Sequence, residues 1–456
     1  MLIPSNRLSK TWVDFIQAIR GWDSSQDLIE LEKSQWLPLA EVQKINFNRL
    51  CVLLEHCQRN VPFYRDAMKA SGFDLKNFRS LDDLRSLPLV TKSDLRRNYE
   101  QFRAEGNQGV YDVWSSSGST GEPFSFIRDR RSIKANTFAA LARGRRWWGM
   151  EYGLPEGMIW SGLSDLTGTV GGRFAALRRR ISWSLKNVTL VDVYLLNDEA
   201  IQGAYQAFER SRPKGLRAIA SGLLRFCDGI EKLGLDGRKL GIEIAIYTGE
   251  GLSNPQRQRI ETILGCKTVS EYGCTELGII AFECPEGGLH ISHENLIVEY
   301  LVNGRPAQEG ERGELVITNL NDRIYPLLRY KTGDIAVPTD RTCPCGRSLP
   351  LMKEMQGREH DFIQTPQGKT IHGLFFTHLF DQLQQVRQFR VIQKQLDQLS
   401  FEIVIAGEEK NRICSLVQTM AQDKLDEPMK VSVLAVDSIP VSSSGKTRWI
   451  ISEVNK

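Results

Sequence analysis

The sequence predicts an α/β protein with a large N-terminal domain of layered sheets and helices and a small α+β C-terminal domain. Between residues 109 and 335, short apolar runs of strand length alternate with segments of helical spacing, a pattern typical of layered α/β folds. After Gly357 a second, shorter series of strands and one helix begins. The chain has 456 residues, 41% of them hydrophobic, which is enough for two separate cores. We therefore expect a domain over 1–356 and another over 357–456.

The first part of the large domain, residues 1–105, is expected to be a mainly helical lead-in. Apolar residues recur near helical spacing over 39–58. Within 87–95, Thr91 or Ser93 is expected to cap a short helix, and we expect no chemistry from this segment. A strand is expected over 110–114, and helical spacing follows over 129–148.

The remaining elements follow from the same periodicities. In the large domain, strands are expected over 157–162, 187–194, 216–222 and 241–249, and helices over 200–211, 223–233 and 254–264. Asn254 is expected to be the N-cap of the last helix, with Pro255 in its first turn. In the small domain, strands are expected over 386–393, 400–406 and 430–436, and a helix over 408–424.

A loop rich in glycine and hydroxyl residues separates the strand at 110–114 from the helical segment. Its residues are Ser115, Ser116, Ser117, Gly118, Ser119, Thr120, Gly121, Glu122 and Pro123. Glycines let backbone N–H groups turn toward an anion, and hydroxyls donate further hydrogen bonds, so this pattern suits phosphate. The spacing is not that of a Walker loop. A solvated turn is the alternative interpretation.

Four more motifs follow the loop in order. They are Tyr272-Gly273-Cys274-Thr275-Glu276, Tyr330-Lys331-Thr332-Gly333-Asp334, Gly357-Arg358-Glu359-His360-Asp361 and Ser443-Ser444-Gly445-Lys446-Thr447-Arg448. Together with the loop, this set resembles the adenylate-forming superfamily, and in detail its phenylacetate–CoA ligase branch, which includes CapK-like proteins. The resemblance spans roughly residues 60–449.

The resemblance implies a set of ATP-binding residues. Ser116, Ser117, Gly118, Ser119, Thr120 and Gly121 would wrap the β- and γ-phosphates. Tyr272, with Gly273 beside it, would stack on the adenine and line the acid pocket, and Glu250 would lie next to the adenine. Asp334 and Arg358 would bind the ribose hydroxyls, a task that suits a carboxylate with two acceptor oxygens. Superfamily members often carry a lysine directly after the loop. This chain has Phe124 at that position, and the phenylacetate–CoA ligase branch also lacks the lysine.

The resemblance also implies the catalytic groups. Thr275 would bind the α-phosphate, and Glu276 would hold Mg²⁺, which prefers carboxylate oxygens and bridges ATP phosphates. Lys446 would bridge the acid and the α-phosphate during adenylation only. The small α+β domain would be mobile and would then rotate about a hinge beside Arg358. The usual hinge residue is replaced here by His360, with Asp361 next, so the identity of the hinge residue is open.

The expected reaction is the ATP-dependent activation of a carboxylic acid, aromatic by branch resemblance, with coenzyme A as the acceptor that forms a thioester. Carboxylates lack a good leaving group, and forming an acyl adenylate supplies one. Two alternatives stay open: transfer to an amine, a hydroxyl or a carrier-protein thiol, and a non-catalytic scaffold that keeps the fold.

A second group of residues suggests a structural zinc site. Cys284 and His290 form a C-x5-H pair, and Cys343 and Cys345 a C-x-C pair. Three thiolates and one imidazole suit tetrahedral Zn²⁺ and leave no open catalytic position. Some members of the resembled branch carry such a zinc. Reduced thiols without metal, or His293 in place of His290, are the alternatives.

Charge and hydropathy argue against nucleic acid as a partner and against a membrane span. A net charge of +4 is too small to indicate nucleic acid, and the chain has no 18-residue apolar run for a membrane span. Without a signal-peptide pattern, nine reduced cysteines in the cytoplasm are expected. The basic stretch from Arg143 to Lys186 is interpreted as a solvated face or as a site for a polyanion. The oligomeric state is open, with a homodimer as one expectation.

Overall fold

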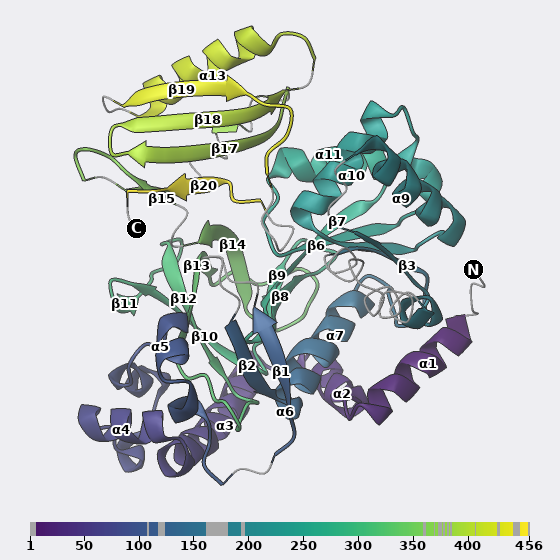
Figure 1. Cartoon of the computed structure of the whole chain (residues 1–456). Helices are drawn as coiled ribbons and strands as arrows, with labels where there is room; N and C mark the ends of the chain where they lie inside the picture. The colour runs from purple at the N-terminus through teal and green to yellow at the C-terminus, as the bar shows by residue number, and fades with distance from the viewer. Residues whose placement is uncertain are drawn as a thin grey trace.

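The structure is a computed structural model of the chain. It describes residues 6–106, 109–116, 124–160, 181–192, 197–358, 362–368, 370–372, 376, 379–380, 383, 385–405, 407–425, 429–440 and 447–454. Within these ranges, Figure 1 shows a large lower part and a small upper part, built from the N-terminal and C-terminal segments respectively.

One large sheet organises the N-terminal part. Over the described residues it has twelve strands in the order β11-β10-β12-β13-β14-β9-β8-β7-β6-β5-β3-β4. The strands are β3 (Glu156–Trp160), β4 (Val188–Asp192), β5 (Gly215–Ile219), β6 (Ile244–Thr248), β7 (Lys267–Cys274), β8 (Gly278–Glu283), β9 (Leu289–Ile291), β10 (Leu296–Val302), β11 (Arg305–Pro306), β12 (Gly313–Asn319), β13 (Tyr330–Thr339) and β14 (Leu351–Arg358).

The relative direction of neighbouring strands in the sheet changes at β7. From β4 to β7 the strands are parallel, and from β7 to β11 they are antiparallel. The helices α9 (Asp198–Ser211), α10 (Ala220–Lys232) and α11 (Asn254–Leu264) form one core with the parallel half. The carboxyl ends of parallel strands share one edge, which is where open α/β sheets bind ligands. The segments that follow β6 and β7 therefore meet at that edge.

The start of α11 corrects one expectation. Ser253, not Asn254, is the N-cap: its side chain accepts the N–H of Gln256, and the Gln256 side chain accepts the N–H of Ser253. This reciprocal pairing satisfies two backbone donors at once, so the helix begins one residue earlier than the Asn-Pro pattern suggests.

The N-terminal segment packs helices against the antiparallel half. Its α-helices are α1 (Asn6–Ile19), α2 (Ser25–Ser34), α3 (Leu39–Asn60), α4 (Pro62–Ser71) and α5 (Lys92–Arg97), and its 3-10 helices are η1 (Leu75–Asn77), η2 (Leu81–Ser86) and η3 (Tyr99–Phe102). Thr91 caps α5, because its hydroxyl accepts the N–H of Asp94 while the Asp94 carboxylate accepts the N–H of Thr91. Val90, just before this cap, pairs with Tyr330 of β13. The cap thereby fixes the start of α5 beside the main sheet.

A hairpin of β1 (Tyr111–Ser116) and β2 (Phe124–Asp129) leads into a helical segment. That segment comprises α6 (Arg130–Ser132), a π-helix η4 (Ile133–Ala139) and α7 (Ala140–Arg146). The wider π turn directs Asn136 into a buried amide cluster, where it bonds Asn319 and Asn321. π-helical turns are rare and often lie at functional sites.

Two carboxylates tie the base of the hairpin to the chain before β13. Asp322 accepts hydrogen bonds from the backbone N–H groups of Asp129, Ile324 and Tyr325. Asp129 in turn accepts the N–H of Arg323 at 3.2 Å. Burial, with a smaller contribution from neighbouring Asp129, raises the pKa of Asp322 to about 7.

This pKa predicts a pH dependence of stability. An unperturbed aspartate titrates near about 3.9, so between about pH 4 and pH 7 the folded chain holds a proton that the unfolded chain has lost. The contribution of Asp322 to stability should therefore decrease as pH rises across that window, by a few kcal/mol in total at most. In Asp322→Asn the contribution is absent. Thermal unfolding from pH 4 to pH 8 should show the melting temperature of the wild type falling relative to the variant; parallel curves would contradict the assignment.

The C-terminal part has its own sheet and core. Its strands are β15 (Phe362–Gln364), β16 (Thr370–His372), β17 (Val386–Gln395), β18 (Gln398–Ile405), β19 (Lys430–Ala435) and β20 (Ile450–Ser452), with the helix α13 (Lys410–Leu425). The four-stranded sheet has the order β19-β18-β17-β20, and its buried residues form a cluster separate from the others. The exact boundary between the two domains stays a prediction, since residues 359–361 lie outside the described ranges.

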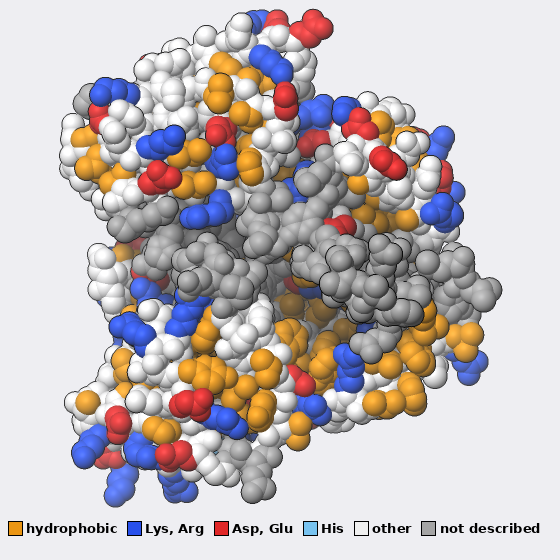
Figure 2. All heavy atoms as spheres, viewed as in Figure 1, with side chains coloured by type: hydrophobic (Ala, Val, Ile, Leu, Met, Phe, Trp, Pro, Cys, Tyr) orange, Lys and Arg blue, Asp and Glu red, His pale blue; other side chains and the backbone are white. Residues whose placement is uncertain are grey.

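The surface differs between the two parts. Figure 2 shows acidic and basic side chains interspersed over the small domain and the neighbouring lobe of α10 and α11, whereas hydrophobic side chains gather over the lower half of the same face. Val110, Tyr111 and Val113, in and before β1, are among the exposed hydrophobic residues of the chain. In the part of the chain that the structure describes, no helix has the length and apolarity needed to cross a bilayer.

The basic stretch is neither a solvated face nor an anion site at its first residues. Arg143 lies 2.5 Å from Glu294 and Arg145 2.7 Å from Glu156, and all four side chains are buried. Buried cations need such partners, which the local sequence does not reveal. Arg146 pairs with Glu32 at the surface. Arg173, Arg178, Arg179 and Arg180 lie outside the described residues.

Candidate active site

Three of the predicted nucleotide-binding residues meet across the large sheet. The Tyr272 hydroxyl, on β7, donates to Asp334 Oδ2 on β13 at 2.7 Å. In the β13–β14 ladder, Asp334 is paired in register with Arg358. Sheet topology thus brings together residues from three separate motifs. Burial, with neighbouring Asp334 second, raises the pKa of Tyr272, so its hydroxyl stays a donor at neutral pH.

The turn after Tyr272 is bounded by two positions, 273 and 278, at which the space allows only glycine. A Cβ on Gly273 would lie 2.4 Å from the carbonyl oxygen of Gly278, and one on Gly278, whose φ is +86°, would lie 2.6 Å from that of Asn136. The π-helix η4 therefore presses directly against this turn. Thr275 and Glu276, which lie between the two glycines, are held in one position as a result.

Glu276 is buried and has a cationic partner. Lys92 Nζ, at the start of α5, lies 3.2 Å from Glu276 Oε1, and the side chains are 30% and 7% exposed. The sequence analysis assigned no chemistry to the Lys92 segment, because a lysine 184 residues before the acidic motif carries no local signal. The structure places this positive charge beside the predicted magnesium ligand.

Arg128 is the second residue that sequence reasoning missed. Its guanidinium is buried, donates from Nη1 to the carbonyl oxygen of Thr275 at 3.0 Å and stacks over Trp114 at 5.2 Å. It therefore links the β1–β2 hairpin to the Thr275–Glu276 turn. Its only sequence signal is a position just after the glycine-hydroxyl loop.

The glycine-hydroxyl loop itself is anchored but mostly outside the described residues. Ser116 pairs with Phe124 at the mouth of the hairpin, and Ser115 Oγ lies 2.7 Å from Ser125 Oγ. Ser117, Gly118, Ser119, Thr120 and Gly121 fall beyond the described ranges, as does the side chain of Ser116. Their phosphate-binding role stays a prediction.

Glu250 follows β6 and connects the two domains. Its Oε2 accepts the N–H of Ser221 at 2.8 Å, and its Oε1 accepts the N–H of Thr447 at 2.5 Å. Thr447 is the residue after Lys446, which lies outside the described ranges together with the predicted hinge residues His360 and Asp361. The sequence predicted Glu250 beside the nucleotide but not this contact with the small domain.

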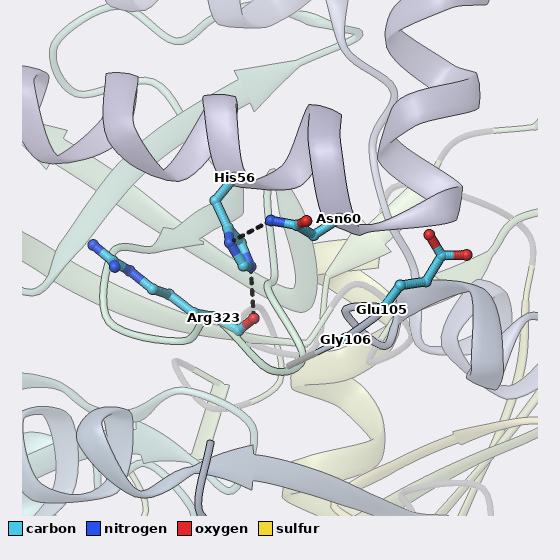
Figure 3. A pocket seen from close by; sticks show the side chains of 5 residues that line it. All are labelled: His56, Asn60, Glu105, Gly106 and Arg323. Carbon is cyan, nitrogen blue, oxygen red and sulfur yellow. Dashed lines mark hydrogen bonds between the residues drawn. The ribbon is translucent and has the colours of Figure 1, made fainter. Parts of the chain in front are cut away.

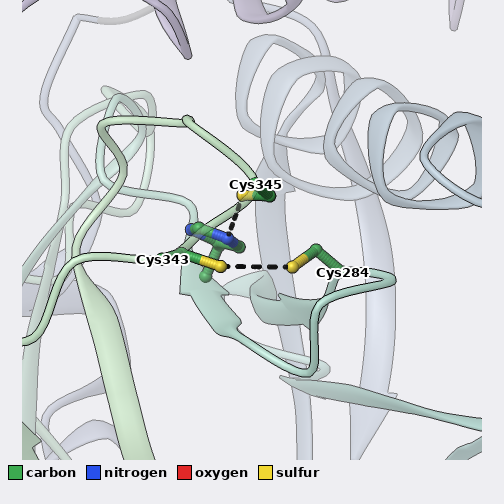
Figure 4. Close-up of side chains that lie close together, drawn as sticks. Cys284, Cys343 and Cys345 are labelled. Atoms are coloured by element: carbon green, nitrogen blue, oxygen red, sulfur yellow. Dashed lines mark hydrogen bonds between the residues drawn. The ribbon is translucent and has the colours of Figure 1, made fainter.

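The predicted zinc ligands form one cluster. The ligand atoms of Cys284, His290, Cys343 and Cys345 all lie within 4.8 Å of one another. Figure 4 shows Cys284 and Cys343 facing each other, with their sulfurs 3.5 Å apart, and Cys345 Sγ lies 3.2 Å from His290 Nε2. Two sulfurs bound to a tetrahedral zinc at 2.3 Å would lie about 3.8 Å apart, and a disulfide would require about 2.05 Å. The geometry fits a metal site.

The pKa shifts of His290 and Cys345 agree with that fit, whereas burial raises the pKa of Cys284 to about 12 and disfavours its thiolate. Burial lowers the pKa of His290 to about 4, so the imidazole is neutral and can ligate. Its Nδ1 donates to the carbonyl oxygen of Leu349 at 3.2 Å, which leaves Nε2 facing the sulfurs. Burial opposes ionisation of Cys345, but hydrogen bonds from Arg347 lower its pKa overall.

Comparison with known proteins identifies the family. The chain is 30% identical over 337 residues to the phenylacetate–coenzyme A ligase of Thermus thermophilus, covering 72% of each protein. The chain belongs to the phenylacetate–CoA ligase family. The predicted fold class is confirmed, because a crystal structure of 2-hydroxyisobutyryl-CoA ligase in the postadenylation state matches with a TM-score of 0.74 at 19% identity, over 92% of this chain and 91% of that one.

Two further comparisons concern the C-terminal part. The family model of the CapK C-terminal domain matches residues 363–453, and protein CapK of Staphylococcus aureus is 21% identical over 91% of this chain and 90% of that protein. A second structure of 2-hydroxyisobutyryl-CoA ligase, in the thioesterification state, matches with a TM-score of only 0.61 at 21% identity, over 92% of this chain and 91% of that one. The predicted relation to the CapK-like phenylacetate–CoA ligases is confirmed.

A surface pocket beside the end of α3 contains none of the predicted site residues. It measures about 280 Å³ and is lined by His56, Asn60, Glu105, Gly106 and Arg323 (Figure 3). His56 Nε2 donates to the carbonyl oxygen of Arg323 at 2.8 Å, and His56 Nδ1 accepts from the Asn60 amide at 3.0 Å. Both ring nitrogens are engaged, so we assign His56 to holding α3 against the 321–325 segment.

Proposed function

We propose that the chain activates an aromatic carboxylic acid of the phenylacetate type with ATP and then transfers the acyl group to coenzyme A. As a family member it is an AMP-forming acid–CoA ligase; the acid and the residue roles are what we propose. The observation that carries the proposal is the hydrogen bond between Tyr272 and Asp334, two separate nucleotide motifs, with Glu276 in the turn that follows the same strand, β7.

In the adenylation step, the side chains bind and orient ATP. The Tyr272 ring would stack on the adenine, while Asp334 and Arg358 would bind the ribose. Thr275, whose carbonyl is held by Arg128, would donate its hydroxyl to the α-phosphate. Lys446 would stabilise the charge that develops between the acid and the phosphate.

Magnesium fits the acidic end of this site. Glu276 offers a buried carboxylate, the ligand type that Mg²⁺ takes together with ATP phosphates. When bound, Mg²⁺ would neutralise phosphate charge. Lys92, paired with Glu276, would add a positive charge at this end of the site, in a chain that has Phe124 in place of a loop lysine.

In the second step, the thiol of coenzyme A would attack the acyl carbonyl of the adenylate, and AMP would leave as the thioester forms. The small domain would rotate near Arg358, remove Lys446 and admit the thiol, so that one site performs two reactions. The working compartment that we propose is the cytoplasm, where thiols stay reduced. A homodimer remains a prediction.

An adenylation screen tests this function. ATP–pyrophosphate exchange with aryl, fatty, hydroxy and amino acids should be fastest with an aryl acid, and the product should then form only with coenzyme A. Exchange without coenzyme A dependence would favour another acceptor. A folded protein without any exchange would favour the scaffold alternative.

We also propose that the cluster of Cys284, His290, Cys343 and Cys345 holds a structural zinc. It ties the β8–β9 turn to the segment before β14. Protein purified without a histidine tag should contain about one zinc per chain, and Cys345→Ser should lower both zinc content and melting temperature, because metal binding adds to folding free energy. Cys414→Ser is the matched control, since Cys414 lies in α13, outside the cluster. Metal-free protein of unchanged melting temperature would rule the site out.

A further inference from the structure

Among the residues that the structure describes, the two domains meet through polar groups rather than through a shared apolar core. The buried hydrophobic cluster of the small domain draws only on residues from Ile363 to Ile450, and those of the large domain end at Met352. Figure 2 shows basic and acidic side chains side by side where the small domain meets the lobe of α10 and α11. Interfaces of this kind permit relative domain motion.

The first polar contact joins α10 to the start of β17. Arg259, on α11, pairs with both Asp228 and Glu231 of α10. From the small domain, Gln388 Nε2 donates to Asp228 Oδ2 at 3.4 Å, and Arg387 Nη2 lies 3.7 Å from Glu231 Oε2. Figure 1 shows the corresponding end of β17 facing the lobe of α10 and α11. Asp228 and Glu231 thus each contact Arg259 of the large domain and one side chain of the small domain.

The second polar contact joins Glu250 of the large domain to Thr447 of the small domain. Its carboxylate bridges the N–H of Ser221, in the first turn of α10, and the N–H of Thr447 in the small domain. A carboxylate at a helix N-terminus is also stabilised by the helix dipole. Thr447 is only 6% exposed. This hydrogen bond fixes the residue that follows Lys446 at the edge of the sheet where the nucleotide motifs converge.

We propose that Glu250, Asp228 and Glu231 form a domain clasp that holds the small domain in the adenylation position and opens before acyl transfer. The three are positioning residues, since they act through the placement of the segment that carries Lys446. The inference rests on the proposed function. The higher TM-score with the postadenylation structure than with the thioesterification structure, 0.74 against 0.61, agrees with this domain arrangement.

The strength of the clasp suits a reversible step. The Arg387 and Glu231 side chains are 27% and 39% exposed, so their attraction is weak and is screened by salt. A few such contacts bias the domain position without locking it. Loss of any one should shift the population of the two arrangements rather than unfold either domain.

Arg387→Gln tests the first contact. ATP–pyrophosphate exchange with phenylacetate should fall about two- to fivefold, the range for a partly exposed ion pair. Arg390→Gln is the matched control: Arg390 lies three residues on in the same strand, but its partner, Glu402, belongs to the small domain itself. An equal loss in both variants would overturn the clasp.

Glu250→Gln tests the second contact. The amide can accept only one of the two N–H groups, so exchange should fall about tenfold. Transfer from synthetic phenylacetyl-AMP to coenzyme A should fall much less than exchange does, because the released small domain reaches the transfer position more easily. A parallel fall in both reactions would show that Glu250 acts on nucleotide binding or folding instead.

Scattering from the ligand-free protein separates the clasp from the proposed function. In the wild type, the radius of gyration should increase as salt rises from 50 mM to 500 mM; in Arg387→Gln it should already be high at low salt. No acid is needed, so this result stands even if phenylacetate is not the substrate. Identical, salt-independent values in both proteins would overturn the clasp, while absent exchange in the wild type would overturn only the function.

Discussion

Replacing Lys446 by alanine should slow formation of the acyl adenylate by about a hundredfold or more, while transfer from a supplied acyl-AMP to coenzyme A continues. The expected loss is that of one charge contact made in the transition state. Its neighbour Thr447 is hydrogen-bonded to Glu250 beside the nucleotide motifs, which supports a role for this segment in the first step. Single-turnover assays of the two half-reactions would measure the two effects separately.

The control for this variant is another lysine of the small domain. Lys430 is 74% exposed and pairs with Asp397, remote from the contact between Thr447 and Glu250. Lys430→Ala should leave both half-reactions unchanged. If Lys446→Ala slows both half-reactions equally, the lysine does not distinguish the two steps, and the domain rotation loses its main support.

Local periodicity predicted much of the fold. The expected strand at 241–249 and helix at 200–211 correspond to β6 and α9 within a few residues. Their apolar residues are buried on one side or throughout, and burial is what produces these patterns. The π-helical turn at 133–139 was not predicted, because a single wider turn leaves the apolar spacing almost unchanged.

The active site could be predicted only through the family resemblance. Tyr272 and Asp334 are 62 residues apart, and their contact depends on how β14, β9 and β8 lie between their strands. Spacing along the chain does not specify such geometry. The contact between Glu250 and Thr447 was missed for the same reason, since it depends on where one domain rests on the other.

Charge runs were the least informative signal. Arg143 and Arg145 looked like part of a solvated or anion-binding face, yet their partners, Glu294 and Glu156, bury them. Lys92 was overlooked, although it contacts a predicted metal ligand. In each case the partner, rather than the charged residue, decides the role, and a single sequence does not name the partner.

Lys92 should affect both the ligand-free protein and the first half-reaction. In Lys92→Met, the buried carboxylate of Glu276 loses its cation, which should cost about 1–3 kcal/mol after allowing for the partial exposure of Lys92. Pyrophosphate exchange should fall about ten- to a hundredfold, because a positive charge beside the phosphates is lost. Lys214→Met is the matched control: that lysine is similarly exposed and lies 3.5 Å from Glu243.

A double-mutant cycle decides whether the two residues act through each other. Glu276→Gln removes the buried charge, so Lys92→Met should destabilise the ligand-free protein much less in that background than in the wild type. Exchange should not recover in the double variant, since the carboxylate proposed for Mg²⁺ is gone. The double variant should therefore lose little further stability relative to Glu276→Gln, while its exchange stays low. Additive losses of stability would mean that Lys92 does not compensate Glu276, and normal exchange in Lys92→Met would remove Lys92 from the phosphate site.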